Sequence, residues 1–203
     1  SDVNALVLDS NGTPYVAYRD QSNGGKITVK YFDGSNWQNV GNAGFTSGMG
    51  CCAYDDFGFA LDSNNVPLVA FVDSSNSNKA TVMEFDGSNW QNVGNAGFTN
   101  PISYISLAID PNNVPYISIQ DGTSYKPTVM KFENKTWKEA GNSGSSSYNS
   151  EIVSIAYDST NSKYVAFMDS DQKDKATVIK YDGLNSWSRV GIPGFTPDRA
   201  GWP

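Results

Sequence analysis

The chain repeats one unit of about 50 residues four times, and this repetition restricts its possible folds more than any other feature. Four aspartates each close a short apolar run at intervals of 53, 48 and 48 residues, namely Asp9, Asp62, Asp110 and Asp158. Four tryptophans follow at matching offsets: Trp37, Trp90, Trp137 and Trp187. Residues 32–46 and 85–99 both read FDGSNWQNVGNAGFT, an identity that indicates duplication. Repeats of this length are typical of solenoids, propellers and arrays.

Within each unit the pattern predicts four short β-strands. The runs are rich in β-branched and aromatic residues, and they are separated by turns rich in Asp, Asn and Gly. No segment carries an apolar stripe of helical period and length. In the first copy the expected strands are Val3–Leu8, Tyr15–Arg19, Ile27–Phe32 and Trp37–Val40.

Four antiparallel strands per repeat predict an all-β fold, a β-propeller of four four-stranded antiparallel blades. One such sheet has two apolar faces and buries both only by stacking on its neighbours. We expect one domain with blades over approximately 1–46, 47–99, 100–146 and 147–203. Each tryptophan would then lie between blades, and small residues would let the inner strands approach the axis: Ala17, Ala70, Ser118 and Ala166.

These motifs resemble the repeats of secreted β-propeller proteins, loosely grouped with sialidase-like and kelch-like propellers. The resemblance rests on the repeated aspartates and tryptophans, the Asp-Gly pairs beginning at Asp33, Asp86 and Asp182, and the Gly-Phe pairs beginning at Gly44, Gly97 and Gly194. The third copy departs from it, with Glu133-Asn134 in place of Asp-Gly and Ser145 in place of Phe. The resemblance implies a fold and leaves function open, because propellers host many unrelated functions.

Four repeats permit three assemblies. The chain can be a closed ring, half of a larger ring completed by a second copy, or part of a longer array. The expectation favoured here is a closed monomeric ring, in which the fourth blade packs on the first. A homo-oligomer that completes a larger propeller remains the alternative.

Composition excludes several functions. The formal charge is −7, with 14 Lys and Arg against 21 Asp and Glu, which argues against nucleic acid as a partner. No apolar run is long enough for membrane insertion. The chain has no histidine, so a Ser-His-Asp triad and every histidine metal site are absent. We therefore expect no enzyme, no cofactor and no metal.

The low charge and the turn-rich sequence indicate a secreted or cell-surface protein. Two N-glycosylation motifs begin at Asn11 and Asn134. Cys51 and Cys52 are adjacent, and they can be reduced thiols, a vicinal disulfide or an interchain disulfide.

Candidate binding residues cluster on one rim of the expected propeller. Polar residues border the hairpins between the second and third strands of each unit: Arg19, Asp20, Asp73, Asp121 and Asp169. Tyrosines in or near the rim loops add aromatic surface for sugar rings: Tyr54, Tyr104, Tyr125 and Tyr148. For the aspartates the alternative is a structural role in fixing each turn.

We therefore expect a non-catalytic extracellular binding or adhesion module that recognises a glycan or a cell-surface protein. The alternatives are a structural subunit of a filament or surface layer, and a sialidase-like glycosidase or lyase.

Overall fold

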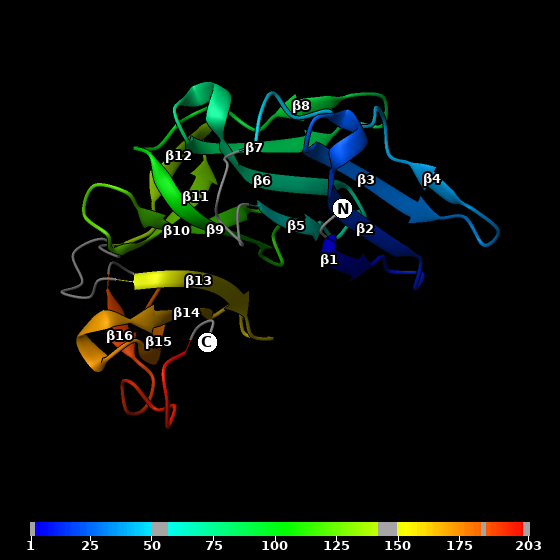
Figure 1. The fold of residues 1–203 in the computed structure, drawn as a ribbon. Coiled ribbons are helices and arrows are strands. Elements are labelled where there is room, and N and C mark those ends of the chain that lie inside the picture. Colours follow the sequence, from blue (N-terminus) through cyan, green and yellow to red (C-terminus); the bar gives the residue numbers. More distant parts are fainter. Residues whose placement is uncertain (1–2, 50–56, 142–149, 184–185, 201–203) are drawn as a thin grey trace.

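The computed structural model describes residues 3–49, 57–141, 150–183 and 186–200, and the side chains of Val3, Asn4, Ser150, Glu151 and Ile152 are not described. The described strands form four separate four-stranded antiparallel sheets, each in simple up-and-down order. The fold is therefore the expected all-β propeller architecture. Figure 1 shows the sheets following one another around an arc.

The strands agree closely with the sequence pattern. The first sheet contains β1 (Val3–Leu8), β2 (Pro14–Asp20), β3 (Lys26–Phe32) and β4 (Trp37–Asn39). The second contains β5 (Phe57–Leu61), β6 (Pro67–Asp73), β7 (Lys79–Phe85) and β8 (Trp90–Asn92). The third contains β9 (Ile102–Ile109), β10 (Pro115–Asp121), β11 (Pro127–Glu133) and β12 (Thr136–Glu139). The fourth contains β13 (Ser150–Tyr157), β14 (Lys163–Asp169), β15 (Lys175–Tyr181) and β16 (Trp187–Arg189).

Three-residue 3-10 turns follow three of the second strands: η1 (Gln21–Asn23), η2 (Ser74–Asn76) and η4 (Ser170–Gln172). An aspartate caps each of them, because its carboxylate accepts a hydrogen bond from a backbone N–H of the turn. The third sheet has no such turn after β10. No helix in the described part of the chain has the length and apolarity of a membrane span.

The core consists of three apolar clusters, one at each junction between consecutive sheets. At every junction the earlier sheet contributes mostly smaller residues, such as Ala17 and Val29 of the first sheet. The later sheet contributes larger ones, such as Phe59 and Phe71 of the second. We call these the small face and the large face of a sheet. Large side chains thus fill the space that small ones leave, which gives close packing between blades.

The tryptophans join the sheets as expected. The indole Nε1 of Trp90 donates a hydrogen bond to the carbonyl of Val40 in the first sheet, at 2.9 Å. Trp137 donates in the same way to Val93 (2.7 Å), and Trp187 donates to Ala140 (2.9 Å). Trp37 of the first sheet is 44% exposed, whereas Trp90 is 9% exposed.

Of the four small residues expected near the axis, Ala17, Ala70 and Ser118 are fully buried, but Ala166 of the last sheet is exposed. The expected closed ring is likewise not what the structure shows. The inner strands pack in the series β1 on β5, β5 on β9 and β9 on β13, and no comparable packing joins the first and fourth sheets among the described residues. Figure 1 places these two sheets at opposite ends of the arc.

Candidate functional site

Three of the rim aspartates are buried inside their own turns. Asp20 is 7% exposed, and Asp73 and Asp169 are fully buried. Each lies at the end of a second strand and accepts a hydrogen bond from a threonine of the third strand, at 2.8–2.9 Å: Thr28, Thr81 and Thr177. The same threonine hydroxyls accept hydrogen bonds from the backbone N–H groups of Gly44, Gly97 and Gly194. This repeated network ties the hairpin to the segment that leaves each sheet.

The hydrogen bonds of Asp20 show the electrostatic consequence. Its carboxylate accepts from the side chains of Ser22, Asn23 and Thr28, and these donors lower the pKa of Asp20 to about 2. The aspartate therefore stays ionised, and its hydrogen bonds stabilise the turn.

The first junction is covered by the chain that leaves the first sheet. The hydroxyl of Ser47 donates to both carboxylate oxygens of Asp73, at 3.0 Å each. A Cβ on Gly48 would lie 2.6 Å from the hydroxyls of Ser74 and Ser75, so the backbone there is pressed onto η2. Met49 packs against the core cluster of this junction.

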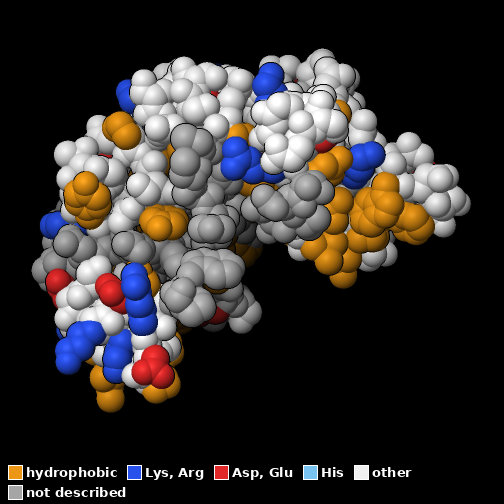
Figure 2. Space-filling model, viewed as in Figure 1, with side chains coloured by type: hydrophobic (Ala, Val, Ile, Leu, Met, Phe, Trp, Pro, Cys, Tyr) orange, Lys and Arg blue, Asp and Glu red, His pale blue; other side chains and the backbone are white. Residues whose placement is uncertain are grey.

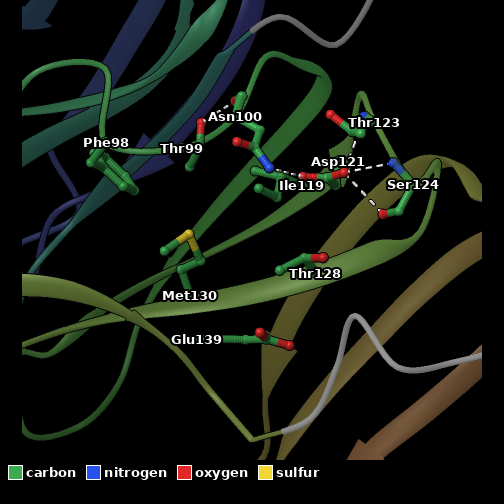
Figure 3. A pocket seen from close by; sticks show the side chains of 10 residues that line it. All are labelled: Phe98, Thr99, Asn100, Ile119, Asp121, Thr123, Ser124, Thr128, Met130 and Glu139. Atoms are coloured by element: carbon green, nitrogen blue, oxygen red, sulfur yellow. Dashed lines mark hydrogen bonds between the residues drawn. The ribbon is translucent and has the colours of Figure 1, made fainter.

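The second junction is different, because the chain enters β9 at Ile102, only two residues after Asn100. The hairpin between Asp121 and Lys126 is also one residue shorter than its counterparts in the other sheets. A groove of about 770 Å³ opens here between the second and third sheets (Figure 3). Phe98, Thr99 and Asn100 line it from the second sheet, and the third sheet supplies Ile119, Asp121, Thr123, Ser124, Thr128, Met130 and Glu139.

Asp121 has capacity to accept further hydrogen bonds. Its Oδ1 accepts from the backbone N–H groups of Thr123 and Ser124 and from the Ser124 hydroxyl. Its Oδ2 accepts only from Asn100 Nδ2, at 3.2 Å, among the described residues. The equivalent oxygen of Asp73 accepts from three donors: Ser47, Asn76 and Thr81. A carboxylate oxygen has two lone pairs, so the Oδ2 of Asp121 can accept an incoming hydroxyl.

The threonine at the equivalent position of the third sheet, Thr128, does not take part in the turn network of the described residues. Thr128 aligns with Thr81, yet in the part of the chain that the structure describes no hydrogen bond joins Thr128 to Asp121. Figure 3 shows its side chain lining the groove, apart from the aspartate. Its hydroxyl can therefore both donate and accept toward a ligand.

The Asp121 carboxylate is ionised at neutral pH. Partial burial alone would raise the pKa of its carboxyl, but the hydrogen bonds from Ser124, Asn100 and Thr123 outweigh this and hold the pKa below its ordinary value. Glu139 lines the same groove from β12 (Figure 3). The groove thus offers carboxylate acceptors, an amide and hydroxyls beside the apolar side chains of Phe98, Ile119 and Met130.

The remaining predicted residues lie in several places. Tyr125 is 57% exposed beside Ser124, in the hairpin that borders the groove. Tyr104 is half-buried and packs against the core between the third and fourth sheets. Arg19 donates from Nε to the carbonyl of Gly25 within its own hairpin, at 3.3 Å. Asn11 and Asn134 both lie in exposed turns. Tyr54, Tyr148, Cys51 and Cys52 lie outside the described residues.

The structure therefore brings one predicted aspartate, Asp121, into the groove and keeps three in structural turns. Sequence reasoning did not single out Asn100, Thr128 or Glu139. The available signal was the shorter third hairpin, because one deleted residue removes the 3-10 turn that fills this space in the other sheets.

No family model and no curated protein sequence matches the chain. Several solved structures, however, match the chain in fold. The SapL1 lectin in complex with alpha methyl fucoside is 15% identical, with a TM-score of 0.66, and the match covers 94% of this chain and 62% of that one. The Aleuria aurantia lectin, as a mutant in complex with alpha-methyl-L-fucoside, is 17% identical with a TM-score of 0.64 and the same two coverages.

A polysaccharide lyase, an ulvan lyase, also matches, at 12% identity and a TM-score of 0.60, over 94% of this chain and 55% of the enzyme. The chain thus spans about three fifths of the length of each lectin. At these identities the matches establish the β-propeller fold.

Proposed function

We propose that this chain is a non-catalytic carbohydrate-binding module that holds a glycan in the groove between the second and third sheets. One observation carries the proposal: at this junction the Asp-Thr network of the other sheets is opened, which leaves Asp121 and Thr128 lining a groove. Sugars present hydroxyls that donate and accept hydrogen bonds, and C–H faces that pack on apolar side chains. The groove contains partners for both.

Two of the structural matches support this assignment. The two lectins share the fold and are described with fucosides bound. A fucoside is therefore the first probe to test. We also propose, from the low charge and turn-rich composition, that the module acts outside the cell or at the cell surface in recognition or adhesion.

A glycan array followed by titration calorimetry with methyl α-L-fucoside and with the best array ligand tests the proposal. The variants Asp121→Asn and Thr128→Val should each weaken glycan binding about 10-fold or more, since each removes an oxygen that would pair with a ligand hydroxyl and leaves that hydroxyl unpaired. Asp171→Asn is the matched control, because this exposed carboxylate lies on the fourth sheet, and its affinity should equal that of the unchanged chain.

Two results would contradict the proposal: an array without any ligand, or full affinity in Asp121→Asn. Two carboxylates, Asp121 and Glu139, line the groove, and this favours a second candidate, a glycosidase that uses them as its paired acid and base. Product release from an acidic polysaccharide or a sialylated substrate, abolished in Glu139→Gln, would replace the binding assignment with this one.

A further inference from the structure

The three junctions inside the chain follow one rule. The large face of the later sheet packs on the small face of the earlier sheet, and a tryptophan of the large face donates to a carbonyl of the small face. A glycine next to that carbonyl makes room for the rings. A Cβ on Gly41 would lie 2.7 Å from the Phe85 ring, and one on Gly94 would lie 2.9 Å from the Phe132 ring.

Among the residues that the structure describes, no small face covers the large face of the first sheet. Leu6 and Leu8 are each 63% exposed, whereas their counterparts Phe59 and Leu61 in the second sheet belong to the first junction core. Trp37 completes this face, and its exposed fraction of 44% contrasts with 9% for Trp90. Figure 2 shows hydrophobic side chains gathered over this sheet.

The fourth sheet presents the complementary small face. Ala156 and Ala166 are exposed, and Val190, the counterpart of Val40, is 41% exposed against 6%. A Cβ on Gly191 would meet nothing within 4 Å, so the space that the rings occupy beside Gly41 is open here.

Phe195 lies at the edge of the fourth sheet, and one face of its ring is open in the same way. Its counterpart Phe45 stacks on Trp90, with ring centroids 3.9 Å apart and planes at 3°, and Phe98 stacks on Trp137 at 4.6 Å and 6°. Phe195 is 58% exposed. It therefore has the position of a residue that stacks on the tryptophan of a following sheet, and no such tryptophan lies beside it in the described part of the chain.

We propose that a second copy of this chain docks head-to-tail, with its first sheet on the fourth sheet of its partner. A second copy carries the large face that the fourth sheet accepts, including a Trp37 indole positioned to donate to the carbonyl of Val190 and to stack on Phe195. Two large faces do not complement each other, because neither contains the glycine recess. The interface is therefore heterologous, with different surfaces on the two copies.

Light scattering coupled to size exclusion tests this, over roughly 1 µM to 1 mM protein. The unchanged chain should give masses above 22.0 kDa that rise with concentration. Leu6→Asp damages only the large face and Val190→Asp only the small face, so each variant alone should remain a monomer. Both positions are exposed, so neither variant should unfold the chain, which circular dichroism checks. Ser88→Asp adds the same charge in an exposed turn of the second sheet and should associate normally.

Mixing the two variants is decisive. Leu6→Asp retains an intact small face and Val190→Asp an intact large face, so an equimolar mixture should form a 1:1 pair of twice the monomer mass. A face-to-face dimer of large faces would instead let Val190→Asp associate alone. Association of Val190→Asp alone would overturn the proposal. So would a mixture that stays monomeric, or an unchanged chain whose mass is 22.0 kDa at every concentration. Sugar binding plays no part in this test, so it fails or succeeds independently of the glycan assignment.

Discussion

The duplicated segment provides a natural matched pair for measuring what a blade junction contributes to stability. Trp37 and Trp90 lie in identical stretches of 15 residues, and each has a similar contact with the phenylalanine of its own hairpin. The ring centroids of Phe32 and Trp37 are 5.6 Å apart at 51°, and those of Phe85 and Trp90 are 5.6 Å apart at 53°. The two tryptophans differ in what lies on the other side: within the described ranges a second sheet packs against Trp90 and none packs against Trp37.

We therefore expect Trp90→Phe to be much more destabilising than Trp37→Phe. The first variant leaves the buried carbonyl of Val40 without its donor, which costs about 1–3 kcal/mol. It also weakens the stack on Phe45, an interaction worth about 0.5–1.5 kcal/mol in such pairs. Together these losses amount to about 1.5–4.5 kcal/mol, whereas the exposed Trp37 should cost about 0.5 kcal/mol.

Urea unfolding and thermal melting measure the difference. At about 2–4 °C per kcal/mol for a chain of this size, Trp90→Phe should lower Tm by roughly 10 °C. The measurements belong at a concentration where light scattering shows monomer, so that a docked copy does not cover Trp37. Equal losses in the two variants would refute the reasoning, because they would show that the indole acts through its own hairpin and not through the junction.

Three further contrasts use the same logic. Gly41→Ala should destabilise the chain by about 1–3 kcal/mol more than Gly191→Ala in urea unfolding. The φ angles are similar, 68° and 70°, but a Cβ at Gly41 would meet a packed ring. Equal losses of stability would mean that backbone strain alone sets the cost of both substitutions. Thr81→Val should cost about 2–4 kcal/mol, since it removes a buried hydrogen bond in each direction, and Thr128→Val less than about 1 kcal/mol, which Tm values check. Because hydrogen bonds lower the folded pKa of Asp20 to about 2, below the unfolded value near 3.9, its contribution to stability is present above about pH 4 and is lost as pH falls through 2. Urea midpoints between pH 5 and 2 should therefore fall less steeply in Asp20→Asn than in the unchanged chain, and parallel curves would contradict this.

Much of the fold is readable from the sequence because local signals and repetition agree. The expected strand Val3–Leu8 is reproduced, and the expected Ile27–Phe32 is extended by one residue to Lys26–Phe32, since strand alternation and Asp or Gly turns are local properties. The open arrangement of the four sheets cannot be predicted from such local signals. Trp37 and Trp90 have the same neighbours along the chain, and only the presence or absence of an adjacent sheet separates an exposed ring from a buried one.

The candidate site follows from a break in the repeat. In three sheets the capping aspartate, its threonine and the glycine of the outgoing segment satisfy one another, which leaves little for a ligand to bind. In the third sheet the shorter hairpin ends in a turn in which the N–H of Tyr125 donates to the carbonyl of Asp121, at 2.7 Å. Repetition thus supplies a rigid scaffold, and one lost residue converts a structural network into a groove with accessible hydrogen-bonding groups. Restoring the six-residue offset by inserting a single Asn into the hairpin after Asp121 should therefore close the groove and abolish glycan binding while preserving the Tm. A filled turn that still binds would place the ligand elsewhere on the arc.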